Sequence, residues 1–197
     1  MGWYGRAGRY TEDAVFASVC ALIASGEYLD EIPGPRLAPA PPEAVAEAEA
    51  VFGYRLPRLL RRLYLEQANG GFGPGYGVLG VRGGHTDDMH NTALGYVQKP
   101  RPDVERSLWP LCHWGCGIFS YVDCSDGAGT IWASDPNPGA PEPFDLFRQQ
   151  LDIVEWFGRW VDRRLVQPAV IQDPETNEWR GATDAELAAF IAEALDG

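Results

Sequence analysis

The chain has 197 residues, 45% of them hydrophobic and 22% charged, so it can bury a core without disulfides or a structural metal. Its net charge of −12 argues against nonspecific binding to nucleic acid, because contacts to phosphates require basic groups. The start has no apolar segment typical of a secretory signal, and the longest nearly apolar run, residues 15–24, is too short to cross a membrane, so we expect a cytoplasmic protein.

The N-terminal part of the sequence predicts a helix followed by a proline-rich linker. Thr11 suits an N-cap, and apolar residues recur after it at helical spacing until Gly26. Five prolines within residues 32–42 then predict an extended segment, because proline cannot continue a helix. We therefore expect residues 1–35 to be an extension of the main domain, which would span residues 36–197.

Two more helices are predicted at the start of the main domain. The first begins at Pro42, is rich in alanine and glutamate, and ends at Gly53. The second begins at Pro57, carries leucines and a tyrosine on one stripe, and ends at the Asn-Gly-Gly of residues 69–71. The stripe of the second helix indicates that it packs one face against the domain.

The middle of the chain is rich in glycine and in short apolar runs, which predicts strands. We expect strands at residues 76–81, 107–112, 117–124 and 130–134, and turn residues separate the last three. Their order along the chain predicts an antiparallel meander.

Helical patterns return after the predicted sheet. Apolar residues at spacings of three and four make residues 144–165 the clearest predicted helix. A short hairpin is expected over residues 169–181. The last predicted helix, residues 183–195, begins with Thr183 and has Glu186 three residues later, which is a capping box. Predicted helices precede and follow the predicted strands along the chain, and this order predicts an α+β fold.

Three of the four cysteines lie within residues 109–124, which raises the question of a metal site. Cys112, Cys116 and Cys124 lack the CxxC pair that zinc sites usually contain. Alternation along the predicted strand places Cys124 on the face of aliphatic residues and Asp123 on the face of aromatic residues. We therefore expect these cysteines to pack as small hydrophobic side chains.

A second group of metal-ligating residue types occurs in the stretch GHTDDMH. His85, Asp87, Asp88 and His90 offer nitrogen and oxygen ligands for a divalent ion. The two histidines are five positions apart, which does not match the H-E-x-x-H pattern, and a polar loop or a helix start explains the stretch equally well. We therefore expect neither a metal site nor a cofactor, and these four residues are weak candidates only.

Two stretches resemble the SUKH superfamily, which is named after the Smi and Knr fungal cell-wall regulators. The first, residues 41–81, contains a glutamate-rich helix, then Leu56-Pro57, an apolar helix and Asn-Gly-Gly. The second is WPLCHWGCGIFSYVDC, followed by a glycine turn and TIWASDPN, and FRQQLDIVEWFGRWV is similar to the closing helix of the family. The resemblance covers about residues 36–164 and leaves residues 165–197 as a C-terminal extension.

The resemblance implies a mixed, mostly antiparallel sheet flanked by helices. It also implies a non-enzymatic protein-binding module without catalytic residues. Bacterial members commonly act as immunity proteins against polymorphic toxins, often nucleases, and fungal members are scaffolds in cell-wall signalling. We therefore expect an immunity protein; the alternatives are a regulatory scaffold that binds a host protein and, more remotely, a metal-dependent enzyme.

The distribution of charge supports a basic protein partner. Residues 109–147 contain five acids and no Lys or Arg, and residues 168–197 contain seven acids and one Arg. Such a surface would complement the basic surface that a nuclease toxin presents to phosphates, although acidity also serves solubility alone. We expect a basic toxin domain as the partner, and neither nucleic acid nor a membrane; the sequence carries no signal for oligomeric state. The expected partner-binding residues are Trp114, Tyr121, Asp123, Asp126, Trp132 and Asp135.

Overall fold

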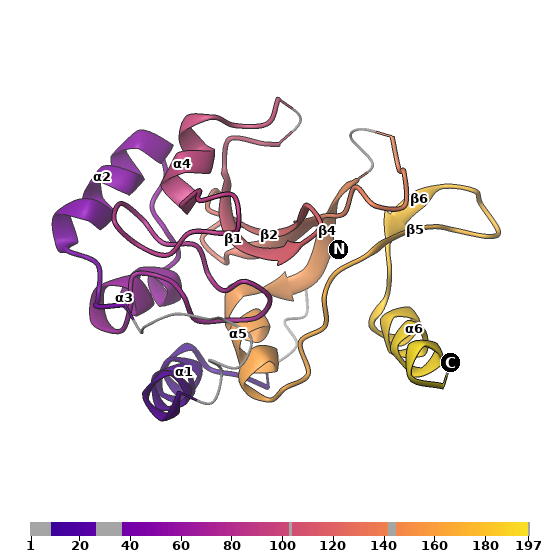
Figure 1. Cartoon of the computed structure of the whole chain (residues 1–197), viewed down its shortest axis with the longest axis horizontal. Helices are drawn as coiled ribbons and strands as arrows, with labels where there is room; N and C mark the ends of the chain where they lie inside the picture. Colours follow the sequence, from indigo (N-terminus) through magenta and orange to yellow (C-terminus); the bar gives the residue numbers. More distant parts are fainter. Residues whose placement is uncertain (1–8, 27–36, 103, 142–144, 197) are drawn as a thin grey trace, which may run out of the picture.

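The computed structural model describes residues 9–26, 37–102, 104–141 and 145–196, and these form the expected α+β fold (Figure 1). The helices are α1 (Glu12–Ser25), α2 (Pro42–Phe52), α3 (Arg58–Glu66), α4 (Ala93–Gln98), α5 (Ile153–Val161) and α6 (Asp184–Asp196). The strands are β1 (Leu108–Gly115), β2 (Ile118–Asp123), β3 (Thr130–Ser134), β4 (Leu146–Asp152), β5 (Val170–Gln172) and β6 (Trp179–Gly181).

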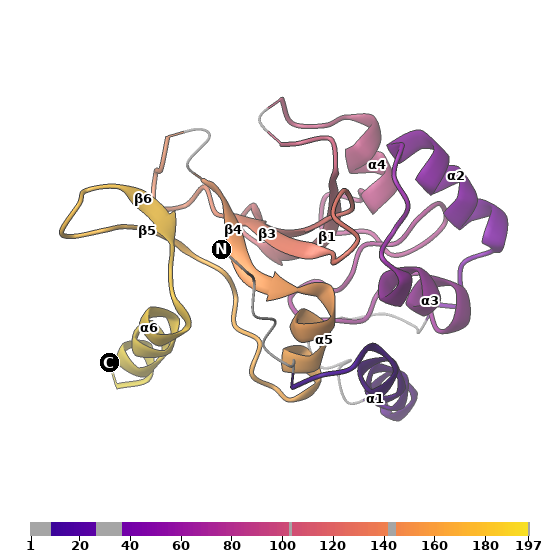
Figure 2. The ribbon, with the colours of Figure 1, turned by 180° about the vertical axis from the view of Figure 1, so that it is seen from behind.

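The main sheet is an antiparallel meander, as the order of the predicted strands suggested. Its strands are hydrogen-bonded in the order β1-β2-β3-β4, so each strand pairs with the next one along the chain. Strands β5 and β6 form the expected separate hairpin. This hairpin and α6 lie at the end of the molecule opposite α2 and α4 (Figures 1 and 2).

Local signals account for several helix ends. The Thr11 hydroxyl accepts a hydrogen bond from the backbone N–H of Ala14, and Gly26 ends α1 with a φ of 73°. At α6 the Thr183 hydroxyl accepts the N–H of Glu186, and the Glu186 carboxylate accepts the N–H of Thr183. The predicted N-cap and capping box are therefore confirmed.

The prediction of one helix over residues 144–165 is wrong. The chain forms strand β4 up to Asp152 and enters α5 at Ile153. Strand β4 pairs with β3, which would otherwise be the exposed edge of the sheet. The Asp152 side chain then accepts the N–H of Glu155 and caps the helix. Helical periodicity was therefore outweighed by hydrogen bonding to a distant edge, which local spacing does not reveal.

The prediction of a strand over residues 76–81 is also wrong, apart from one β-bridge between Val78 and Cys112. The segment lies beside β1, but Gly77 has a φ of 88°, and a regular strand cannot contain that left-handed conformation. The glycines that looked compatible with a strand instead turn the backbone.

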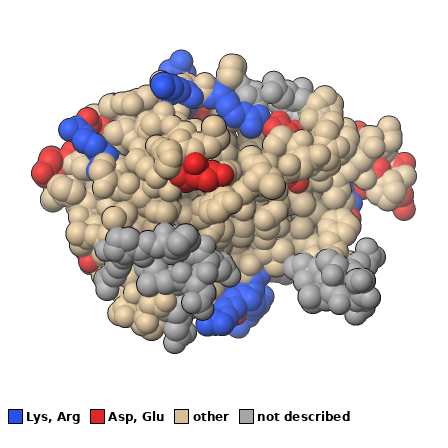
Figure 3. Space-filling view, viewed as in Figure 1, with Lys and Arg blue, Asp and Glu red and all other residues tan. Residues whose placement is uncertain are grey.

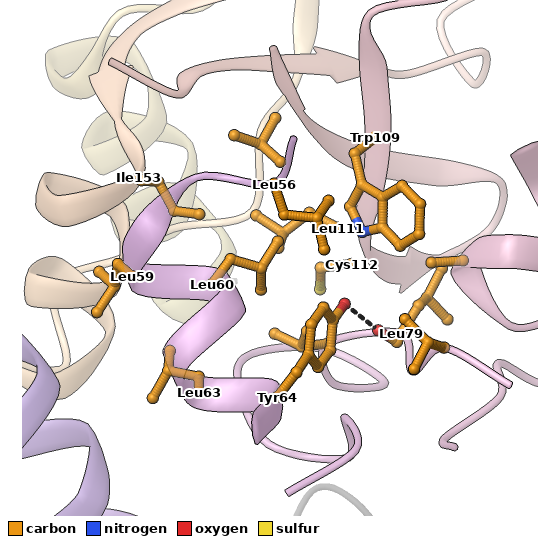
Figure 4. Close-up of a cluster of buried hydrophobic side chains, with 14 of the residues drawn as sticks. Leu56, Leu59, Leu60, Leu63, Tyr64, Leu79, Trp109, Leu111, Cys112 and Ile153 are labelled. Atoms are coloured by element: carbon orange, nitrogen blue, oxygen red, sulfur yellow. Dashed lines mark hydrogen bonds between the residues drawn. The ribbon is translucent and has the colours of Figure 1, made fainter. Parts of the chain in front are cut away.

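The core lies between one face of the main sheet and helices α3 and α5. In Figure 4 the Leu60 side chain of α3 points toward Leu111 and Trp109 of β1, while Leu59 and Leu63 lie on the other side of the helix. Ile153 at the start of α5 belongs to the same cluster. Tyr64 of α3 is fully buried, and its hydroxyl donates a hydrogen bond to the carbonyl oxygen of Leu79. Helix α3 is thereby held against the sheet by packing and by a buried polar contact.

Helix α1 contributes to the same core. Its residues Val15 and Val19 are buried in the cluster, and the helix packs beside α3 and α5. Of the predicted linker, residues 32–42, the first five lie outside the described residues, residues 37–41 have no regular secondary structure, and Pro42 begins α2. The predicted domain boundary after residue 35 therefore stays a prediction.

Candidate binding cleft

The main sheet carries a row of aromatic rings on the face opposite the core. The register pairs His113 of β1 with Phe119 of β2, and Tyr121 of β2 with Trp132 of β3. Side chains alternate along a strand, so Phe119 and Tyr121 share this face, while Val122 points into the core. The Phe119 ring stacks on the His113 ring, with centroids 4.5 Å apart, and on the Tyr121 ring at 5.9 Å.

Helix α4 and the loop after it stand over this aromatic face and enclose a cleft of about 410 Å³. The ring of Tyr96 in α4 packs edge-on against Phe119, with centroids 5.2 Å apart. This volume lies in the range of small-molecule pockets. The lining residues are Val51, Phe52, Met89, Tyr96, Val97, Lys99, Pro100, Arg101, Val104, Glu105, Arg106, Leu108, Pro110, Gly117, Phe119, Tyr121 and Pro136.

Basic side chains outnumber acidic ones in the lining of the cleft. Lys99, Arg101 and Arg106 belong to this lining together with one acid, Glu105, and the Arg101 guanidinium lies 2.8 Å from a carboxylate oxygen of Asp145. Figure 3 shows Lys and Arg side chains gathered over the loop that follows α4, while most of that face of the molecule is neutral. The cleft can therefore accept an apolar side chain that is flanked by acidic groups.

A cluster of three ligand-type side chains adjoins the cleft. The Nδ1 atom of His113 lies 3.1 Å from Oδ1 of Asp88 and 3.8 Å from Oδ2 of Asp87, both from the loop of residues 84–91. The Tyr96 hydroxyl donates a hydrogen bond to Asp87. Burial, together with this hydrogen bond, raises the pKa of Tyr96. Tyr96 is thus shared by the cluster and the wall of the cleft.

The two other weak metal candidates lie outside this cluster. The His85 ring bonds a backbone carbonyl oxygen through Nε2, and His90 is exposed with a φ of 62°. The structure therefore brings Asp87 and Asp88 together, as their adjacency in the sequence suggested, but it places His113 with them in the position expected for His85 or His90.

The three aromatic residues predicted to bind a partner occupy different environments. Tyr121 lines the cleft and is 5% exposed, and Trp132 is half-buried opposite it on β3. Trp114 donates its ring N–H to the Ser120 hydroxyl and packs edge-on against Trp156 of the core. Partner binding by these residues stays a prediction, and only Tyr121 and Trp132 share the face of the cleft.

The acidic residues of the same segment are less open than the sequence suggests. Asp126 is exposed and Asp123 half-buried, whereas Asp135 and Asp145 are buried at 4% and 3% exposure. Partial burial raises the pKa of Asp126, but hydrogen bonds from Thr130 and from backbone N–H groups outweigh it, so the pKa is lowered. Among the described acids of this segment, Asp123 and Asp126 are the ones that reach solvent.

The cysteines do not gather into a ligand group among the described residues. Cys112 is buried in the core, Cys116 is exposed in the turn between β1 and β2, and Cys124 is half-buried against the core. Burial raises the pKa of the Cys112 and Cys124 thiols. Cys112 and Cys124 pack with hydrophobic residues, as the sequence predicted. Cys116 instead lies in the turn, with a φ of 51°.

The sequence interpretation missed Met89, Tyr96 and Phe119 as residues of the cleft. Phe119 could have been found, because strand alternation places it on the same face as Tyr121. Tyr96 lies on α4, which has six residues and gives too short a pattern to recognise.

Comparison with known proteins identifies the family. No helix among the described residues is long and apolar enough to span a membrane. No curated protein and no solved structure shows significant similarity to the chain. The model of the SMI1 / KNR4 family (SUKH-1) matches residues 39–157, which contain α2 to α4, the whole main sheet and the start of α5. The match covers more than half of the sequence, and the chain therefore belongs to the SMI1 / KNR4 family (SUKH-1).

Proposed function

We propose that this chain is a non-enzymatic protein-binding module that works in the cytoplasm as an immunity protein and neutralises a cognate toxin. Membership of the SUKH-1 family supports a binding or regulatory role. The observation that carries the proposal is the aromatic cleft on the outer face of the sheet. Protein interfaces concentrate their affinity where aromatic side chains line a concave, desolvated surface.

The cleft suits an apolar side chain of the partner. Phe119 and Tyr121 form its floor, and Val51 and Met89 on its walls are 47% and 70% exposed. A partner that covers these side chains removes apolar surface from water, which favours formation of a complex. Lys99 at the rim would pair with a carboxylate beside the inserted side chain.

Asp123 and Asp126 form an acidic contact region beside the cleft in this proposal. Asp123 pairs in the sheet with a residue that lines the cleft, and Asp126 follows in the next turn. These carboxylates would meet basic groups of the toxin, such as those with which a nuclease domain binds phosphates. Trp132 would contact the partner on the same face, and Trp114 and Asp135 would support the site from within.

Co-expression tests the proposed role directly. The toxin encoded beside this gene is expressed with and without the chain in a host that lacks both proteins, and growth is followed. We expect the chain to restore growth and the purified proteins to form a complex. Absence of a neighbouring toxin, or arrested growth despite a stable chain, overturns the immunity role. A deletion phenotype without any toxin would instead favour the regulatory scaffold.

A matched pair of substitutions tests the cleft. Val51 and Phe190 are both 47% exposed and both lie on helices, but only Val51 lines the cleft. We expect Val51→Glu to weaken toxin binding at least tenfold, because the new carboxylate would be desolvated against apolar rings. Phe190→Glu should leave the Kd unchanged. Calorimetry measures both, and an equal effect of the two substitutions would contradict the cleft as the binding site.

Salt dependence tests the acidic contact region separately. We expect the Kd to rise with NaCl concentration, because salt screens exposed charge pairs. Asp126→Asn should flatten this dependence while the amide keeps the hydrogen bonds of the turn. A Kd that does not respond to salt would exclude the acidic contacts and leave the cleft as the binding surface.

A further inference from the structure

We propose that Asp87, Asp88 and His113 form a binding site for a divalent transition-metal ion, with Zn²⁺ as the best-suited ion. One nitrogen of His113 and one oxygen of each carboxylate lie within 4.8 Å of one another. The histidine comes from β1 and the two carboxylates from the loop of residues 84–91. A bound ion would therefore connect this loop to strand β1 beside the cleft.

The spacing of the three side chains fits a shared ion. Nδ1 of His113 lies 3.1 Å from Asp88 and 3.8 Å from Asp87. Ligand atoms that stand about 2.0–2.2 Å from a tetrahedral zinc ion are roughly 3.3–3.6 Å apart. The two distances to His113 lie just above and just below this range, and all three ligand atoms lie within 4.8 Å of one another, so an ion can enter after side-chain movements.

The buried imidazole ring of His113 has no hydrogen-bond partner among the described residues. Its side chain is 4% exposed, and neither ring nitrogen has a hydrogen bond within the described part of the chain. The short approach of Nδ1 to Asp88 lacks the geometry of a hydrogen bond. Stacking on Phe119 at 18° holds the ring, with its Nδ1 edge toward the two carboxylates. An ion would supply the partner that a buried polar atom requires.

Asp87 is oriented as a metal ligand requires. Its side chain has no exposed surface, and its Oδ1 accepts hydrogen bonds from the backbone N–H groups of Met89 and Asn91, both at 3.0 Å. Its Oδ2 accepts from the Tyr96 hydroxyl and keeps a second lone pair. Carboxylates that bind metals are commonly held by such outer hydrogen bonds.

Asp88 gives the site access to solvent. Its side chain is 51% exposed, so an ion can enter there and water can complete the coordination. The mixed imidazole and carboxylate ligands favour Zn²⁺ or a similar ion, whereas Mg²⁺ and Ca²⁺ prefer oxygen alone. A competing interpretation is that His113 carries a proton and forms an ion pair with the two aspartates, in which case no ion binds.

Zinc titration of the full chain tests the proposal. The protein carries no histidine tag, is freed of metal with EDTA, and is titrated with ZnCl₂ in a calorimeter. We expect one high-affinity ion per chain, an affinity at least tenfold lower in Asp88→Asn, and no binding in His113→Gln. Excess MgCl₂ should not compete. Zinc should also raise the Tm of the parent chain, raise that of Asp88→Asn by less, and leave that of His113→Gln unchanged.

Two controls exclude other ligands. His90→Asn removes an exposed histidine of the same loop, and asparagine tolerates its φ of 62°. Cys116→Ser removes the exposed thiol. Both variants should bind zinc as the parent does.

Absence of stoichiometric binding, or an unchanged affinity in Asp88→Asn, would overturn the site, and loss of binding in Cys116→Ser would place the ion elsewhere. Asp88→Asn decides the question even if His113→Gln fails to fold, because Asp88 is half exposed. The ion-pair interpretation predicts a lower Tm for Asp88→Asn and no response to zinc.

Discussion

The hydroxyl of Tyr64 donates a hydrogen bond to the carbonyl oxygen of Leu79, 2.6 Å away, and both residues are fully buried (Figure 4). This contact joins helix α3 to the glycine-rich segment beside β1. That segment has one β-bridge to the sheet, between Val78 and Cys112, so the Tyr64 hydroxyl supplies a contact that a regular strand would have made through its backbone.

We expect Tyr64→Phe to lower the free energy of unfolding by about 1–3 kcal/mol, because the Leu79 carbonyl would stay buried without its partner. Tyr76→Phe is the control, since Tyr76 is 40% exposed and water can replace lost contacts. Urea denaturation followed by tryptophan fluorescence measures both. An effect no larger than that of the control would show that the buried hydrogen bond contributes little.

Gly70 and Gly53 should differ in their tolerance of a methyl group. Both have positive φ, 79° and 86°, so alanine is strained at either site, by about 1–2 kcal/mol. A Cβ at Gly70 would stand 2.5 Å from the carbonyl oxygen of Val78 and 2.7 Å from the backbone nitrogen of Gly80, whereas a Cβ at Gly53 would meet nothing within 4 Å. We expect Gly70→Ala to cost at least twice as much stability as Gly53→Ala in thermal unfolding, and equal losses would contradict the close backbone packing.

Thiol reactivity should separate the cysteines of the β1–β2 hairpin. Cys116 is exposed, whereas Cys112 is fully buried and burial raises the pKa of its thiol. Because the thiolate is the reactive form, iodoacetamide should modify Cys116 in the folded protein and Cys112 only after unfolding. Peptide mass spectrometry gives the rates, and rapid native modification of Cys112 would contradict its place in the core.

Arg180 of β6 makes two pH-sensitive contacts, one within the C-terminal hairpin and one to α6. The Arg180 guanidinium bonds Asp173 and Glu186, and this lowers the pKa of each carboxyl to about 2. A carboxyl whose pKa is lower in the folded state stabilises the fold above its unfolded pKa of about 4, and this contribution is lost as the pH falls toward 2.

We therefore expect the ordering of α6 on the hairpin to weaken between about pH 4 and pH 2. Carboxyl ¹³C shifts measure the two pKa values directly. Arg180→Gln should return both toward ordinary values, because the amide carries no charge. Carboxyl pKa values that stay low in this variant would assign the shift to the backbone hydrogen bonds around Asp173 and Glu186 instead.

Much of the fold follows from short segments of the sequence. Thr11, Gly26 and the capping box at Thr183 determine helix ends because the groups that satisfy the backbone lie within a few residues. The strands β1 to β3 follow from alternating side chains separated by turn residues. The family resemblance rests on the same local patterns and is confirmed over residues 39–157.

Strand β4 and the candidate sites depend on contacts between distant segments. The apolar residues of segment 146–152 have helical spacing, yet the segment forms a strand. The edge of β3 offers it backbone hydrogen-bond partners, and the local sequence does not reveal them. The cleft likewise requires α4 to fold over β2, so Tyr96 and Phe119 meet only in the tertiary structure.

The metal-ligand cluster shows the same division. The sequence alone identified Asp87 and Asp88 as candidate ligands, because two adjacent carboxylates in a polar loop can be recognised without knowledge of the fold. It paired them with the nearby His85 and His90, whereas the fold brings His113 to them from β1. Strand alternation determines which face His113 occupies, but only the packing of the loop against the sheet determines what stands opposite its ring.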